Sequence, residues 1–148
     1  MRREPSLRER ALRLLARREH SRAELARKLR EHTRADDDLE ALLEDLSRHK
    51  LLSDERYAES RAHALSRKFG AARIAHELRA KGLDKDLADK ASKTARVTEL
   101  DRAREVWRRK FRNAPRTREE RAKQMRFLQS RGFSFDAIRA VVGGSEAD

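Results

Sequence analysis

Residues 74–88 read IAHELRAKGLDKDLA, and parts of this stretch recur about fifty residues away on both sides. A shift of 49 toward the N-terminus brings Ile74 and Leu78 onto Leu25 and Leu29. A shift of 50 toward the C-terminus carries three residues onto identical ones: Leu78 onto Leu128, Gly82 onto Gly132 and Asp86 onto Asp136. Such self-similarity is typical of stacked supersecondary units, each too small to bury its own apolar face.

The apolar residues around this repeat are spaced three and four apart, which puts them on one face of a helix. Nine short helices explain the pattern, and no stretch alternates apolar and polar residues over the length of a strand. Residues with capping side chains mark the predicted helix starts: Ser6, Ser21, Asp36, Ser53, Asp84, Thr98 and Thr117. Glycines, which can adopt the left-handed conformation, mark four of the ends: Gly70, Gly82, Gly132 and Gly143.

The sequence therefore predicts an all-α fold of three tandem three-helix repeats that form an elongated, curved array. We expect the first repeat to span residues 1–52, the second 53–97 and the third 98–144, with a disordered tail at 145–148. Of the 148 residues, 37% are hydrophobic and 22 are alanine, which buries little area. Three thin cores suit this composition better than one thick core with a deep pocket.

Composition also excludes several kinds of chemistry. The chain has no cysteine, which rules out disulfides, thiolate catalysis and cysteine-ligated metals. No predicted helix carries two histidines four residues apart, and the Asp36-Asp37-Asp38 run lacks the glycine and terminal glutamate of a calcium loop. No glycine-flanked nucleophile or phosphate-binding loop is present. We therefore expect no enzyme activity, no metal and no cofactor.

The chain also lacks the hydrophobic segments that direct proteins to membranes. No apolar run reaches the ~18 residues that a membrane span needs, and no signal peptide follows Met1. We expect a cytoplasmic protein with no membrane partner.

The net charge of +12 predicts a polyanionic or acidic partner, and its position along the chain is informative. Residues 102–131 hold twelve Lys and Arg against three acidic residues. Arg104, Arg108 and Arg112 are four apart and are predicted to share a helix face. The rest of the predicted binding surface comprises Arg109, Lys110, Arg116, Arg118, Arg121 and Arg126, with Arg73 and Lys81 as exposed basic positions of the second repeat.

A solvated basic helix is the alternative interpretation of this charge, but closely spaced arginines repel one another unless an anion is bound. Arginine also binds phosphate and carboxylate groups through two hydrogen bonds. Trp107, Phe111 and Phe127 fall at core-like spacings, so we expect no exposed aromatic side chain to stack on bases. Contact with a nucleic acid would then be independent of sequence and weakened by salt.

Several motifs together resemble the RecX family of RecA regulators. The central ones are DERYAE at 54–59, Phe69-Gly70, Arg73-Ile74, Glu77-Leu78 and Lys81-Gly82-Leu83. The first motif of the family is similar to SRAEL at 21–25 with Leu29, and the last to RGFS at 131–134 with Ile138. Thr33 and Lys50 depart from the pattern, because the family often has glycine there. The resemblance covers residues 7–142.

This resemblance implies three three-helix repeats and no catalysis. It also implies binding to the RecA nucleoprotein filament and damping of its recombinase, ATPase and co-protease activities in DNA repair and the SOS response. A RecA–DNA filament would offer an acidic protein surface as well as single- or double-stranded DNA, and we expect the chain to act as a monomer. The alternative is a helix-turn-helix DNA-binding or nucleoid-associated protein. A structural protein of ribosomes or RNA has only the charge in its favour.

Overall fold

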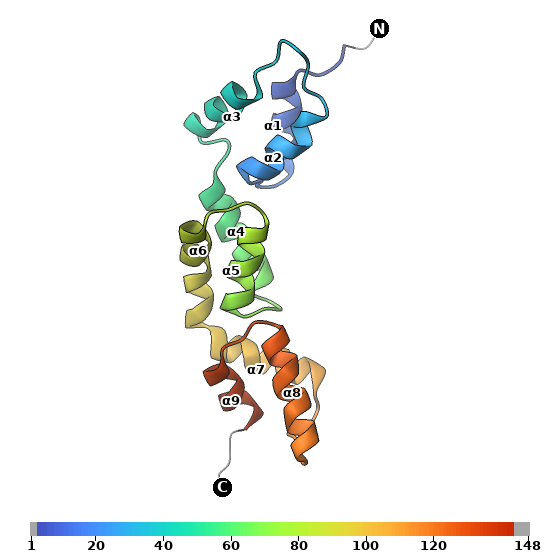
Figure 1. Cartoon of the computed structure of the whole chain (residues 1–148), viewed down its shortest axis with the longest axis vertical. Coiled ribbons are helices and arrows are strands. Elements are labelled where there is room, and N and C mark those ends of the chain that lie inside the picture. The colour runs from blue at the N-terminus through green and yellow to red at the C-terminus, as the bar shows by residue number, and fades with distance from the viewer. Residues whose placement is uncertain (1–2, 144–148) are drawn as a thin grey trace.

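The computed structural model describes residues 3–143, which form nine α-helices and contain no strand over that range. The helices form three groups stacked along the long axis of the molecule (Figure 1). The first unit contains α1 (Leu7–Arg17), α2 (Arg22–Arg30) and α3 (Leu39–Arg48). The second contains α4 (Asp54–Leu65), α5 (Ala71–Ala80) and α6 (Lys85–Val97), and the third α7 (Glu99–Lys110), α8 (Arg118–Ser130) and α9 (Phe135–Val142).

Each unit has a hydrophobic core of its own. The core of the first unit is made mainly of leucines, including Leu25 and Leu29 from α2. Ile74 and Leu78 from α5 occupy the second core among many alanines, and Leu128 from α8 lies in the third. The leucines and the isoleucine that repeat in the sequence are therefore buried residues of each middle helix. This confirms the predicted all-α array of three-helix repeats and its elongated shape (Figure 1).

The extents 1–52, 53–97 and 98–144 of the three repeats stay predictions. The tail at 145–148 lies outside the described residues.

Most of the predicted helix caps are confirmed. The side chains of Ser6, Ser21, Ser53, Asp84 and Thr117 each accept a hydrogen bond from the backbone N–H three residues later. Thr98 precedes α7 without a side-chain capping bond. The prediction for Asp36 was wrong, because Asp38 caps α3 by accepting from the N–H of Ala41 at 3.0 Å. Asp37 accepts from the Arg34 N–H and closes a turn there, so the helix starts only after it.

Of the four glycines predicted to end helices in the left-handed conformation, three are confirmed and one is not. Gly82, Gly132 and Gly143 adopt the expected left-handed conformation, with φ of 93°, 83° and 93°. Gly70 does not: its φ is −80° and it precedes α5. Glycine is required there for a different reason, since a Cβ atom would lie 2.4 Å from the carbonyl oxygen of Gly132. Lys50, where the resemblance predicts glycine, adopts φ of 61° itself.

The middle helices follow one another end to end through tight contacts between units (Figure 1). The turn after α8 packs on the start of α5, where a Cβ atom at Gly132 would lie 2.3 Å from the Arg73 Cβ. The turn after α5 packs on the start of α2 in the same way, because a Cβ atom at Gly82 would lie 2.9 Å from the Ala23 Cβ. The negative end of one helix dipole therefore faces the positive end of the next, which stabilises the column.

A carboxylate from the next unit reinforces each of these junctions. Asp54, the first residue of α4, accepts a hydrogen bond from the Arg22 N–H at 2.7 Å. Glu99, the first residue of α7, accepts one from the Ala71 N–H at 2.8 Å and another from the Ser134 N–H at 2.7 Å. Because these N–H groups lie at helix starts, where backbone donors lack partners, the repeat includes its junction as well as its core.

His20 lies in the connection between α1 and α2 and is buried. Only 2% of its surface is exposed, and its Nδ1 lies 3.1 Å from the Arg18 carbonyl oxygen. Its Nε2 lies 3.0 Å from the Lys28 ammonium group. Burial lowers the pKa of this imidazole. A neutral ring that donates through Nδ1 and accepts through Nε2 satisfies both contacts.

Candidate functional site

The predicted basic surface of the third unit lies on the C-terminal turn of α7, the connection that follows it, and α8. Arg108, Arg109 and Lys110 are exposed in the last turn of α7, where cations favourably oppose the helix dipole. Arg116 is exposed just before α8, and Arg118 and Arg126 are exposed on α8 itself. Five of the predicted residues thus lie on two neighbouring helices, and Arg116 lies on the connection between them.

The prediction that Arg112 shares a helix face with Arg104 and Arg108 was wrong. The helix ends at Lys110, and Phe111 is extended, with φ of −120° and ψ of 134°. Pro115 explains this end, because it has no N–H for the Phe111 carbonyl and its ring would collide with that carbonyl in a continuing helix. Arg112 is exposed on the connection to α8, so it remains on the basic surface in a different position.

Two further predicted residues have contacts within the protein. Arg104 forms an ion pair with Asp101 at 3.7 Å and is only partly exposed. Arg121 donates a hydrogen bond to the Gly143 carbonyl oxygen at 2.8 Å. Both residues therefore border the basic surface without being fully available to a partner.

Arg73 was predicted as an exposed basic position, but it is only partly exposed and its guanidinium has partners within the protein. Its side chain is 39% exposed and forms an ion pair with Glu77. It also donates to the Ser130 carbonyl oxygen at 3.0 Å and lies over the Phe69 ring at 4.7 Å. Because Ser130 ends α8, Arg73 joins the second unit to the third. Lys81 is exposed, as expected.

Arg102 lies within the basic stretch but belongs to the interior. Its guanidinium donates to the carbonyl oxygens of Ser66, Phe69 and Ala95 at 2.8, 2.5 and 2.5 Å. Burial lowers the pKa of this guanidinium. Three carbonyls at the end of the second unit thus bind one arginine of the third, and the charge of Arg102 does not add to the binding surface.

Phe135 is an exposed aromatic residue that was not among the predicted site residues. Phe135 is 63% exposed at the first position of α9, and the Arg139 guanidinium lies 5.5 Å from the centre of its ring. The expectation that no aromatic side chain is available was therefore wrong. The signal was in the helix periodicity, because Ala137, Ile138 and Val142 define the buried face of α9 and Phe135 falls outside it.

Trp107, Phe111 and Phe127 are partly buried, in line with their spacing, and Phe133 is buried in the core of the third unit. Phe111 and Phe127 contact edge to face at 5.5 Å. Lys110 and Arg131 lie over the Phe127 ring at 5.6 and 4.9 Å. The Trp107 indole N–H donates to Gln124 at 2.8 Å. These rings support the basic side chains above them.

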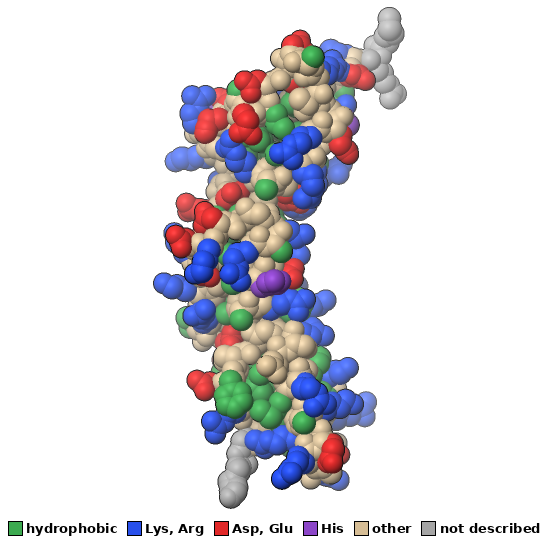
Figure 2. Space-filling view, viewed as in Figure 1, with side chains coloured by type: hydrophobic (Ala, Val, Ile, Leu, Met, Phe, Trp, Pro, Cys, Tyr) green, Lys and Arg blue, Asp and Glu red, His purple; other side chains and the backbone are tan. Residues whose placement is uncertain are grey.

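Most basic side chains of this surface have no acidic partner in the described part of the chain, which leaves them available to bind an anion. Within residues 3–143, none of the following side chains has an acidic partner within 4 Å: Arg108, Arg109, Arg112, Arg116, Arg118, Lys123 and Arg126. Figure 2 shows Lys and Arg side chains on both flanks of the third unit and recurring along the edge over α2, α5 and α8. Such a surface is suited to long-range attraction and direct contact with a polyanion.

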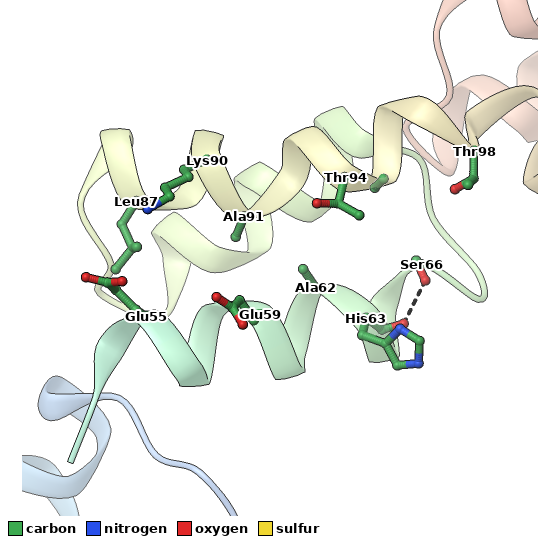
Figure 3. A pocket seen from close by; sticks show the side chains of 11 residues that line it. Glu55, Glu59, Ala62, His63, Ser66, Leu87, Lys90, Ala91, Thr94 and Thr98 are labelled. Carbon is green, nitrogen blue, oxygen red and sulfur yellow. Dashed lines mark hydrogen bonds between the residues drawn. The ribbon is translucent and has the colours of Figure 1, made fainter. Parts of the chain in front are cut away.

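A groove between α4 and α6 has no catalytic arrangement (Figure 3). Small side chains such as Ala62 and Ala91 line it, and Glu55 and Glu59 lie along α4. Ser66 and His63 are neighbours there, but the Ser66 hydroxyl donates to the His63 backbone carbonyl at 2.7 Å and not to the imidazole. This pair therefore does not form a serine–histidine nucleophile.

Across the described part of the chain, no three His, Cys, Asp or Glu side chains gather as metal ligands. No helix in that part is long and apolar enough to cross a bilayer.

Fold and surface together define a helical-repeat protein whose last unit presents unpaired arginines. Models of the first, second and third three-helix domains of RecX match residues 8–46, 53–91 and 98–142. The chain belongs to the RecX family. The regulatory protein RecX of Leptothrix cholodnii is 50% identical over 137 residues, which cover 93% of this chain and 87% of the relative. That of Herminiimonas arsenicoxydans is 45% identical and covers 95% and 93%.

Solved structures show the same fold. The crystal structure of RecX from Lactobacillus salivarius matches with a TM-score of 0.73 and 24% identity, covering 92% of each chain. A second crystal structure, of a regulatory protein RecX, matches with a TM-score of 0.77 and 23% identity, covering 91% of this chain and 70% of the other.

Proposed function

We propose that this protein is a non-enzymatic regulator that binds the RecA nucleoprotein filament. Binding mainly inhibits the recombinase, ATPase and co-protease activities of the filament in DNA repair and the SOS response. Membership of a family of regulatory proteins over nearly the whole chain is the observation that carries the proposal. A monomer acting in the cytoplasm, with no membrane partner, belongs to the same proposal.

The unpaired arginines of the third unit support a role in the contact. A filament of RecA on DNA presents acidic protein surface and phosphate groups together, and arginine binds both kinds of anion. The elongated column lets one chain extend along such a filament. We propose that the third unit makes the main contacts, through the exposed residues Arg108, Arg109, Lys110, Arg112, Arg116, Arg118 and Arg126.

Charge reversal tests this assignment. The variant Arg108→Glu, Arg109→Glu, Arg112→Glu is expected to inhibit RecA-dependent ATP hydrolysis and strand exchange far less than the unchanged protein. A matched control reverses three exposed basic residues outside the surface, Arg30→Glu, Arg67→Glu and Lys93→Glu, and is expected to keep most of the inhibition. Circular dichroism establishes that both variants are folded. Full inhibition by the folded surface variant would show that the contact lies elsewhere.

A helix-turn-helix DNA-binding or nucleoid-associated protein is the second candidate, because small three-helix units with exposed arginines also bind DNA grooves. Salt separates the two functions, since binding through phosphates alone weakens steeply with ionic strength. Binding to RecA filaments that persists where binding to bare DNA is lost supports the first. Loss of both together, or preference for one duplex sequence in a gel shift, supports the second.

A further inference from the structure

A second concentration of arginines without acidic partners among the described residues lies in the first unit, far along the column from the third. It lines a groove between α1 and α2, which we call the first-unit groove. Its lining residues are Arg10, Arg13, Leu14, Arg17, Arg27, Lys28, Leu29, Glu31 and His32. Arg13, Arg17, Arg27 and His32 are exposed, and Glu31 is the single acidic side chain among the nine.

Most arginines of the first unit outside the groove have acidic partners, and among the described residues Arg30 is the exception, which makes this groove distinct. Arg8 pairs with Asp45, Arg18 with Glu24 at 2.6 Å, and Arg22 with Glu40 at 3.2 Å. Among the described residues, none of the four groove arginines has a carboxylate within 4 Å. Lys28, by contrast, pairs with Glu24 at 3.8 Å. The positive charge of the groove therefore comes from its four arginines, whereas most arginines elsewhere in the unit are neutralised by nearby acids.

The spacing of the groove arginines fits a linear polyanion. Arg10, Arg13 and Arg17 are three and four residues apart on one flank of α1, so they span roughly 10 Å along the helix axis. Like charges at this spacing repel one another, and the repulsion is relieved when anions lie along the row. A single small anion would contact only part of it.

The lining also distinguishes a nucleic-acid backbone from an acidic protein. Protein interfaces have an apolar core rich in aromatic residues, whereas this groove offers only Leu14 and Leu29 as apolar side chains. It has no aromatic residue other than His32 on which a base could stack. Guanidinium groups without stacking partners are suited to phosphate contact that ignores base sequence.

We propose that the first-unit groove binds the phosphate backbone of a nucleic acid, independently of the basic surface of the third unit. The tight junctions between units hold the two regions at opposite ends of one column (Figure 1). One chain can then contact two separated stretches of the same strand, and the second contact is strengthened by the first.

The test uses the full chain, a labelled mixed-sequence single-stranded oligonucleotide and no RecA, so its result is independent of the proposed function. The groove variant is Arg13→Gln with Arg17→Gln, because both side chains are exposed and glutamine keeps the helix. The matched control is Arg30→Gln with Arg67→Gln, which removes the same charge from exposed positions outside the groove. Thermal unfolding followed by circular dichroism verifies that both are folded.

Fluorescence anisotropy at several salt concentrations gives the slope of log affinity against log salt. Losing two phosphate contacts on a single strand should make this negative slope shallower, by about 1.4 in the groove variant. In the control it should change far less. Equal affinities and slopes in the two variants would overturn the proposal. It would also be overturned if the groove variant bound the oligonucleotide normally but lost affinity for poly-glutamate, because the groove would then serve an acidic protein.

Discussion

Gly132 packs so closely against Arg73 that a Cβ atom at Gly132 would lie 2.3 Å from the Arg73 Cβ and 2.7 Å from its backbone nitrogen. Two units therefore meet with almost no side chain between their backbones. The Gly70 N–H donates to the Arg131 carbonyl oxygen at 2.8 Å in the same contact. The orientation of the third unit, and hence of its basic surface, depends on glycine at these two positions.

Three glycine-to-alanine variants separate steric crowding from backbone conformation. In Gly143→Ala the added Cβ atom would have no atom within 4 Å, so only the left-handed φ disfavours alanine. We expect this to cost about 1–2 kcal/mol of the free energy of unfolding. Gly70→Ala has an ordinary φ but collides with the Gly132 backbone, which we expect to cost about 1–3 kcal/mol. Gly132→Ala combines both effects and should be the most destabilising in urea denaturation. A Gly132→Ala variant no less stable than Gly143→Ala would contradict the tight junction.

Glu99→Gln should weaken the same junction through hydrogen bonding. The Glu99 side chain is buried, and its two carboxylate oxygens accept from Ala71 and Ser134. A glutamine has one acceptor oxygen, so one backbone N–H would face an NH₂ group and lose its partner. We expect a loss of about 1–3 kcal/mol in the free energy of unfolding. Glu105→Gln, at an exposed position of the same helix, is the control and should be nearly neutral.

The Arg18–Glu24 pair predicts a specific acid sensitivity. The two terminal nitrogens of the Arg18 guanidinium, Nη2 and Nη1, donate to the Glu24 carboxylate at 2.6 and 3.1 Å. These bonds lower the pKa of Glu24 to about 2. A carboxyl whose pKa is lower in the folded state stabilises the fold above its unfolded pKa. That contribution is lost as the pH falls from about 4.5 toward 2.

Arg18→Gln should therefore make the free energy of unfolding less dependent on pH between about 4.5 and 2. At neutral pH the variant should lose about 1 kcal/mol, since Arg18 is half exposed. Urea denaturation at several pH values measures both effects. Arg17→Gln, which removes a charge without an acidic partner, should leave the pH dependence unchanged.

Lys50→Gly should stabilise the protein. Lys50 has φ of 61°, a conformation that opposes any side chain with a Cβ atom. Glycine removes this strain, for an expected gain of about 1 kcal/mol after its greater freedom in the unfolded chain is considered. Lys50→Ala retains the Cβ atom and should give no such gain. A thermal unfolding comparison of the three proteins would contradict the strain if glycine and alanine behaved alike.

Much of the architecture could be predicted because it depends on local chemistry. Ser53 and Asp84 cap helices through side chains that reach backbone groups three residues away, and the spacing of Ile74 and Leu78 places both in one core. Such contacts are short in sequence, so residue type and spacing suffice. The break before α8 likewise follows from Pro115 alone.

The candidate site was less predictable, because exposure and pairing depend on distant residues. Arg73 and Arg108 look alike in the sequence, yet Arg73 donates to the Ser130 carbonyl oxygen and is only partly exposed, whereas Arg108 is exposed. Arg102 is withdrawn from the surface by carbonyl oxygens more than thirty residues away, at Ser66 and Phe69. No local pattern encodes these contacts.

The sequence by itself determined the helices, their threefold repetition and the excess of positive charge, because these follow from periodicity, capping residues and composition. Only the tertiary structure decided which arginines remain unpaired. Junction contacts take Arg73 and Arg102 inward, whereas ion pairs within the first unit leave a positive groove beside Arg13 and Arg17. The physical reason is that an arginine is available to a partner only where folding brings no carboxylate or carbonyl oxygen within its reach.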